Sequence, residues 1–110
     1  MKILNKTKNT VIADDVVEAG SLIDKTLGLL KYSQPQALIM KTRFGIHTFG
    51  MKFPIDVIIL DDKGQVVKVK EKLKPGRAFL WNPKYNTVLE LPDGSIASSK
   101  TKTDDILFFE

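Results

Sequence analysis

Short apolar stretches alternate with turn-forming residues along most of the chain. The clearest stretch covers residues 53–60, is rich in β-branched side chains and ends at the turn sequence Asp61-Asp62-Lys63-Gly64. Residues 65–73 alternate in the same way, so the two segments predict an antiparallel hairpin. Further strands are expected at residues 2–4, 10–13, 37–40, 87–91 and 106–109. Residues 78–81 favour a short strand or a helical turn, and residues 95–98 are one more candidate strand.

One segment has a different, roughly helical spacing of apolar residues. The residues with this spacing are Val17, Leu22, Ile23, Leu27 and Leu30. Asp14 or Asp15 can cap a helix in front of them through a side-chain oxygen. Because Gly20 weakens the first turns, we expect the firm helix to begin near Ser21 and to end near Gly28.

These elements predict one domain over residues 1–110. Seven or eight short strands with a single helix indicate an α+β domain that is mainly antiparallel sheet. We expect the sheet to be curled or partly closed, resembling a β-barrel, because closure limits the number of exposed strand edges. The helix is expected to pack on this sheet.

The composition excludes several classes of protein. The chain has 110 residues, no cysteine and one histidine. Disulfides, cysteine-ligated zinc, iron–sulfur clusters, thiol nucleophiles and a multi-histidine metal site within one chain are therefore excluded. We expect no cofactor and no metal. No apolar run approaches the roughly 18–20 residues of a membrane helix, and the first residues lack the apolar core of a secretory signal. The expected location is cytoplasmic, without membrane contact.

A polar segment that contains two glycines leads into the longest apolar strand. Residues 43–56 read Arg-Phe-Gly-Ile-His-Thr-Phe-Gly-Met-Lys-Phe-Pro-Ile-Asp. The period-two alternation of the strand places Asp56 on the same face as Ile58 and Leu60. A half-buried carboxylate there needs hydrogen bonds or a positive partner, and Arg43 and His47 are the nearest candidates in the sequence.

The residues around this segment form a recognisable combination. They are His47, Thr48, Gly50, Met51, Pro54, Ile55 and Asp56, then Asp61 and Gly64, then Leu89, Glu90, Leu91, Pro92 and Gly94. The combination resembles the archaeal and bacterial version of the family called domain of unknown function 192, over roughly residues 22–109. The chain departs from that pattern at Asp93, where the family often has a small residue, and at Asp104-Asp105, where it usually has Gly-Asp. The resemblance implies a small β-rich domain with no established activity, and it supplies no catalytic residues.

The motif leaves three interpretations open. In the first, Asp56 accepts backbone N–H bonds from residues 45–50 and His47 donates a further bond, so both hold the loop in shape. In the second, a polar pocket serves a non-catalytic binding or interaction module. The ligand-binding candidates of this pocket are Arg43, His47, Thr48, Asp56 and Glu90. In the third, His47 is a general base oriented by Asp56 in a hydrolase or lyase.

Glu90 has two interpretations of its own. It is either the outward residue between Leu89 and Leu91 on a half-buried strand, or it points into the same pocket as Asp56. In the second case the two carboxylates could bind a hard cation or serve acid–base chemistry.

Lysines alternate along the strand predicted at residues 65–73. Lys68, Lys70, Lys72 and Lys74 are expected on one face, with Val67, Val69 and Leu73 toward the core. Residues 63–77 hold six basic residues against Glu71 alone, whereas the whole chain has a net charge of +4. The stripe is either a solvated face that deters edge pairing or an anion-binding surface for an acidic protein or nucleic acid.

A nucleic-acid interaction through this stripe would be weak and salt-sensitive, because the chain has only two arginines. Phe79, Trp81 and Tyr85 are its candidate stacking platforms. Beyond an anionic molecule at the stripe, the sequence specifies no partner.

Overall fold

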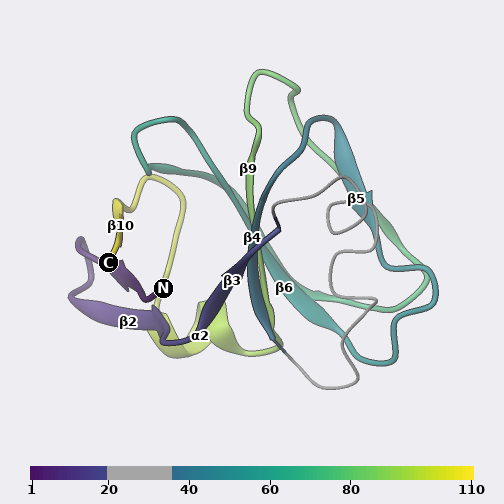
Figure 1. Cartoon of the computed structure of the whole chain (residues 1–110), viewed down its shortest axis with the longest axis horizontal. Coiled ribbons are helices and arrows are strands. Elements are labelled where there is room, and N and C mark those ends of the chain that lie inside the picture. Colours follow the sequence, from purple (N-terminus) through teal and green to yellow (C-terminus); the bar gives the residue numbers. More distant parts are fainter. Residues whose placement is uncertain (20–35) are drawn as a thin grey trace.

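The computed structural model in Figure 1 describes residues 1–19 and 36–110. Its elements, in chain order, are β1 (Ile3–Asn5), β2 (Thr10–Ala13), β3 (Val16–Glu18), β4 (Ala37–Lys41), β5 (Gly45–His47), β6 (Ile55–Leu60), β7 (Val66–Leu73), β8 (Ala78–Leu80), β9 (Thr87–Pro92), α2 (Ser95–Ser99) and β10 (Leu107–Phe109). The helix predicted to begin near Ser21 and end near Gly28 lies outside the described residues.

The described strands form three sheets, with the orders β10-β1-β2, β3-β4-β9-β6-β7 and β5-β8. All of their pairings are antiparallel except that of β3 with β4. The prediction of a mainly antiparallel, β-rich fold is therefore confirmed. None of the three sheets closes into a barrel within the described ranges, so the curled, barrel-like sheet is not confirmed.

The five-stranded sheet divides the interior of the molecule into two cores. β6 lies between β9 and β7, and all six of its residues are buried. Ile58 and Leu60 join a cluster on one face that includes Ile96 of α2, whereas Ile55, Val57 and Ile59 join a cluster on the other face. The first cluster also contains Ile3, Ile12 and Leu107, and the second contains Met51, Phe79 and Trp81.

We call the two faces of this sheet the α2 side and the β5 side. Figure 1 shows the sheet β10-β1-β2 and α2 to the left of the central strands and β5 to their right. The alternation predicted for residues 53–60 is confirmed, because Ile58 and Leu60 lie on the α2 side and Ile55, Val57 and Ile59 on the β5 side.

Two local predictions fail, and one strand was not predicted. Residues 95–99 form the helix α2 and not a strand, because Gly94 takes a left-handed φ of 93° that ends β9 and turns the chain into a helix. Residues 16–18 form the strand β3, paired with β4, where the helical spacing placed Val17 in a helix. β5 was not expected at all.

No helix in the two described ranges has both the length and the apolar character needed to cross a membrane.

Candidate functional site

Asp56 is completely buried on the α2 side of the central sheet. Its Oδ1 accepts the backbone N–H of Lys72 at 3.0 Å, and its Oδ2 accepts the backbone N–H of Ile96 at 2.8 Å. The carboxyl group therefore joins β7 to the start of α2, and it satisfies two amides that would otherwise be costly to bury. The expectation that Asp56 holds residues 45–50 is wrong, since both amides come from elsewhere.

The amide of Lys72 is available to Asp56 because β7 contains a bulge at this point. Ile55 of β6 pairs with Leu73 and Val57 pairs with Lys70, so Glu71 and Lys72 together lie opposite Asp56. Lys72 has a left-handed φ of 50°. A bulge inserts an extra residue and so changes which face of the strand each later side chain occupies.

The bulge divides the predicted lysine stripe. Lys68 and Lys70 pair with Ile59 and Val57, so their side chains lie on the β5 side. The ammonium of Lys72 instead lies 3.3 Å from Asp93, directly before α2. The prediction that Lys68, Lys70, Lys72 and Lys74 line one face is therefore wrong.

His47 is exposed and belongs to β5, on the other side of the central sheet from Asp56. Its Nδ1 accepts the backbone N–H of Phe49 at 3.3 Å, and its ring stacks on that of Phe49 with 5.1 Å between centroids. The strand that pairs with β5 is β8, whose Phe79 belongs to the β5-side core. The structure thus does not bring His47 to Asp56, because strand alternation turns the carboxyl group to the α2 side.

Thr48 has the loop-holding role that the sequence suggested for Asp56. Its side chain is fully buried, and its hydroxyl accepts the N–H of Arg77 at 2.9 Å and donates to the carbonyl of Lys74 at 2.6 Å. Its own backbone N–H donates to Arg77 and its carbonyl accepts from Gly76. Thr48 therefore fastens the chain between β7 and β8, and His47 does not reach its hydroxyl.

The two remaining candidates, Arg43 and Glu90, lie apart from Asp56. Arg43 is exposed, and its Nη1 donates to the carbonyl of Pro83 at 2.6 Å. Glu90 is buried in β9, where it pairs with Val57 and so faces the β5 side, whereas Asp56 pairs with Leu91. A shared pocket for Asp56 and Glu90 is therefore wrong. Within residues 1–19 and 36–110, no three His, Asp or Glu side chains are grouped as metal ligands.

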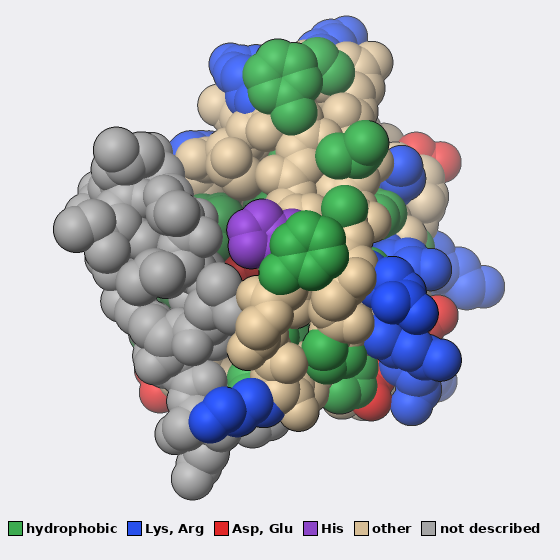
Figure 2. All heavy atoms as spheres, turned by 90° about the vertical axis from the view of Figure 1, so that its right-hand side faces the viewer, with side chains coloured by type: hydrophobic (Ala, Val, Ile, Leu, Met, Phe, Trp, Pro, Cys, Tyr) green, Lys and Arg blue, Asp and Glu red, His purple; other side chains and the backbone are tan. Residues whose placement is uncertain are grey.

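The β5–β8 ribbon and the residues beside β5 carry highly exposed apolar side chains. Ile46 and Phe79 pair across the ribbon and contact the core, so His47 and Leu80 face outward. Phe44, Phe49 and Leu80 are 66%, 57% and 67% exposed, the highest values for large hydrophobic side chains in the described part of the chain. Figure 2 shows the histidine among these hydrophobic groups. We call Phe44, His47, Phe49 and Leu80 the apolar platform.

A glycine allows the two strands of this ribbon to approach closely. A Cβ at position 45 would lie 2.8 Å from the carbonyl oxygen of Phe79 and closer still to Leu80. Only glycine therefore lets Leu80 lie across β5, next to His47. The two glycines beside exposed phenylalanines were the available signal for this surface, but in the sequence they indicated only a loop.

The charged residues of the two connections that carry the apolar platform are all basic. The connections that contain β5 and β8, residues 42–54 and 74–86, hold five Lys and Arg residues and no Asp or Glu. Lys68 adds a further charge, since its ammonium donates to the carbonyl of Leu80 at 2.9 Å and lies 4.8 Å from the ring centroid of Phe79. Figure 2 shows Lys and Arg side chains along one edge of the same face.

Two of the three aromatic residues expected to stack on bases are part of the core, and the third, Tyr85, is partly buried against it. Phe79 and Trp81 are only 9% and 7% exposed, and the indole N–H of Trp81 donates to the carbonyl of Tyr85. A side chain that packs inside the protein cannot present its ring to a base, so the prediction of stacking platforms at Phe79 and Trp81 is wrong.

A buried polar network on the α2 side was not found from the sequence. Asn5 donates from its side-chain amide to Thr101 at 3.0 Å and to Asp105 at 2.9 Å, and the ammonium of Lys8 lies 2.8 Å from both oxygens of Asp105. Burial by itself raises the pKa of Asp105, but Asn5, Lys8 and the N–H of Lys102 outweigh it and hold that pKa below its ordinary value of 3.8. The network joins β1 to the segment before β10.

Comparison with known proteins supports the fold and provides no activity. The family model described as DUF192, Uncharacterized ACR, matches residues 6–109. A crystal structure of a protein of unknown function from Novosphingobium aromaticivorans DSM 12444 is similar with a TM-score of 0.83 at 15% identity, covering 99% of this chain and 84% of that one. A second, of a "putative transcription regulator" from Sinorhizobium meliloti 1021, has a TM-score of 0.79 at 15% identity, covering 97% and 89%. No curated protein matches.

Proposed function

The chain belongs to the DUF192 family, whose description assigns no activity, and we propose that this member is a non-catalytic binding module for an acidic segment of a partner protein. The binding surface is the apolar platform. One observation carries the proposal: the three most exposed large hydrophobic side chains of the described residues lie in β8 or within two residues of β5, in connections that hold only basic charged residues.

The exposed apolar area gives the platform its capacity to bind. Burying a Phe or Leu side chain contributes about 1.5–3 kcal/mol relative to leaving it in water. Phe49 is already held against His47 by stacking and by a backbone hydrogen bond, so little side-chain entropy is lost when a partner covers it. Aromatic side chains of this kind often dominate the binding energy of an interface.

The basic residues near the platform determine the sign of the charge that a partner must carry. Lys68 and Lys70 lie on the same side of the central sheet as the platform, and Lys52 and Arg77 lie in the connections after β5 and before β8. An acidic segment gains complementary charges there, which raises its association rate at low salt. A basic segment would be repelled.

The same surface favours a protein over a nucleic acid. The chain has only two arginines, the side chain favoured for bidentate recognition of phosphate. Of the two arginines, Arg43 already donates to Pro83. The likeness to the structure called a transcription regulator concerns the fold, because only 15% of residues are identical.

The geometry of His47, Thr48 and Asp56 argues against a catalytic function. The hydrolase or lyase expected as an alternative needs a base, its orienting acid and a nucleophile within hydrogen-bonding distance. His47 and Asp56 lie on opposite sides of the central sheet, and the hydroxyl of Thr48 is engaged by Arg77 and Lys74.

The cytoplasmic location, the single domain over residues 1–110 and the curled sheet stay predictions.

Selection from a displayed library of random 12-residue peptides tests the proposal. We expect the enriched peptides to carry net negative charge together with aromatic or aliphatic residues. Their dissociation constants should rise at least tenfold with the double variant Phe49→Ser/Leu80→Ser, measured by fluorescence anisotropy. The matched control is Val11→Ser/Phe108→Ser, which removes two exposed apolar side chains from the sheet β10-β1-β2 and should leave binding unchanged.

Three results would overturn the proposal. They are the absence of any enriched peptide, enrichment without an excess of acidic residues, and an equal loss of binding with the control variant. Tighter binding of a 12-nucleotide oligo-dT than of the enriched peptides would assign the surface to nucleic acid instead. Thermal unfolding of each variant shows whether a loss of binding comes from a loss of folding.

A further inference from the structure

β7 is an edge strand whose outer side is covered only at one end. At Val66, the N–H donates to Asp105 and the carbonyl accepts from Asp104, each at 2.8 Å. At the other end, the bulge turns the N–H of Lys72 to Asp56. Between these points, within the described residues, the backbone of residues 67–71 bonds only to β6. An edge strand of this kind presents alternate N–H and C=O groups to any chain that lies beside it.

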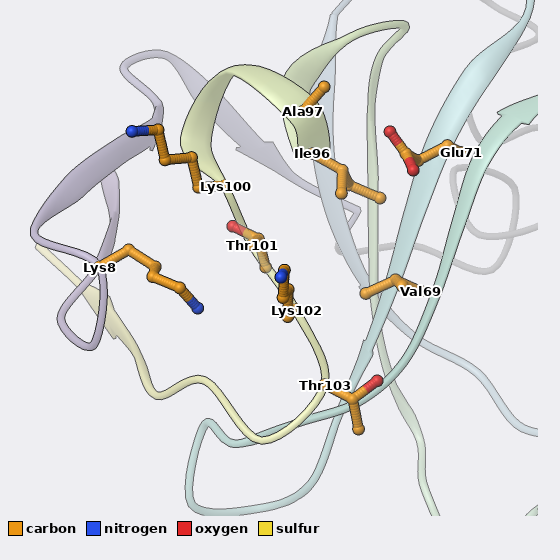
Figure 3. Close-up of a pocket in the computed structure, with 9 residues that line it drawn as sticks. All are labelled: Lys8, Val69, Glu71, Ile96, Ala97, Lys100, Thr101, Lys102 and Thr103. Atoms are coloured by element: carbon orange, nitrogen blue, oxygen red, sulfur yellow. The ribbon is translucent and has the colours of Figure 1, made fainter.

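A groove of about 720 Å³ adjoins this open stretch on the α2 side. Figure 3 shows Val69 and Glu71 of β7 on one side of the groove and residues 100–103 on the other. Ile96 and Ala97 of α2 complete an apolar floor with Val69. The groove can therefore receive side chains from a strand placed at the edge of β7.

Basic side chains lie on both faces of the open stretch. Lys68 and Lys70 lie on the β5 side, and Lys100 and Lys102 line the groove on the α2 side. Glu71 is the one acidic side chain that lines the groove. Lys8 also lines it, but its ammonium is paired with Asp105. The excess of positive charge repels the same edge of a second copy and attracts a chain with acidic residues.

We propose that the open edge of β7 and this groove form a strand-addition site for a short, extended, acidic segment of a partner protein. The backbone of that segment bonds to residues 67–71. Every second side chain of the bound segment enters the groove over Val69 and Ile96, and the side chains between them point to Lys68 and Lys70 on the opposite face. The site does not depend on the apolar platform, because no platform residue lines the groove.

Synthetic peptides test this site directly. We expect acetyl-(Glu-Val)4-amide to shift the amide NMR signals of residues 67–71 in the ¹⁵N-labelled full chain. The variant Lys100→Glu/Lys102→Glu should weaken this binding at least fivefold. The control Lys6→Glu/Lys63→Glu, which reverses two exposed lysines outside the groove, should leave it unchanged. The platform variant Phe49→Ser/Leu80→Ser should also bind normally, which separates this site from the proposed function.

A second peptide distinguishes strand addition from simple charge attraction. The same sequence with N-methyl groups on alternate residues keeps its charge but cannot complete a ladder of hydrogen bonds. We expect it to bind at least tenfold more weakly. Equal binding of the N-methylated peptide, or unchanged signals of residues 67–71 with the unmodified peptide, would overturn the proposal. So would tight binding of acetyl-(Lys-Val)4-amide.

Discussion

The two sides of the central sheet differ in the polar groups that they bury and in the apolar groups that they expose. On the α2 side, Asp56, Asn5 and Asp105 are almost fully buried, and each makes several hydrogen bonds. On the β5 side, Phe49 and Leu80 remain more than half exposed. Buried polar groups that are fully bonded fix a structure, whereas large exposed apolar groups contribute little to the stability of the isolated chain. The contrast indicates that the buried polar groups of the α2 side stabilise the fold, whereas the exposed apolar groups of the β5 side are the basis of the proposed function.

The same contrast divides the sequence motif. His47, Thr48 and Asp56 lie within ten residues of one another, but the central sheet separates the exposed imidazole from the buried carboxyl group. Asp56 satisfies backbone N–H groups of β7 and α2, and Thr48 satisfies backbone groups of the segment between β7 and β8. Thr48 and Asp56 therefore support local structure, whereas His47 is exposed beside Phe49.

The largest expected effect is that of Asp56→Asn. The new amide would direct its NH₂ group at a backbone N–H of Lys72 or Ile96, so one buried donor would lose its acceptor. We expect a loss of about 3 kcal/mol in the free energy of unfolding, measured by urea denaturation. Asp93→Asn is the control, because its ion pair with Lys72 is exposed and contributes little. A similar loss in both variants would show that Asp56 has no special structural role.

A smaller, pH-dependent loss is expected for Asp105→Asn. At pH 7 the variant should be less stable by about 2 kcal/mol, because Asn5 and Lys8 lose a charged acceptor. The folded pKa of Asp105 is lowered, so its stabilisation is complete above the ordinary value of 3.8 and disappears as the pH falls through the lowered pKa. The stability difference from the wild type should therefore narrow only below about pH 4.

Denaturation curves between pH 2 and pH 7 check this dependence. Asp104→Asn is the matched control, since Asp104 is the exposed neighbour of Asp105. A difference between wild type and Asp105→Asn that stays constant across this range would contradict the ionic role of Asp105.

The smallest effect is expected on the β5 side itself, for Thr48→Val. The isosteric valine leaves the N–H of Arg77 and the carbonyl of Lys74 without the hydroxyl, which costs about 1–2 kcal/mol. Hydrogen exchange at the amides of residues 74–77 should accelerate more than elsewhere in the chain. Thr103→Val, at an exposed threonine, should change neither measurement. Uniform acceleration over the whole chain would show that Thr48 does not act locally.

The sequence by itself determined the elements whose patterns are local. The β6–β7 hairpin follows from period-two alternation and the turn after Leu60, and the same alternation correctly assigned Asp56 to the face of Ile58. The apolar–polar period of a strand depends only on neighbouring residues, so it can be recognised without the fold. The short segment at residues 95–98 was too brief for that, since four residues do not distinguish a strand from a helix.

Only the tertiary structure decided which side chains meet. Asp56 bonds to amides 16 and 40 residues away in the sequence, and Asn5 bonds to Asp105 across nearly the whole chain. The bulge at Glu71 and Lys72 then moved Lys72 away from Lys68 and Lys70, although their spacing in the sequence is regular. Such contacts depend on strand order and register, and these are set by the packing of the two cores against the central sheet.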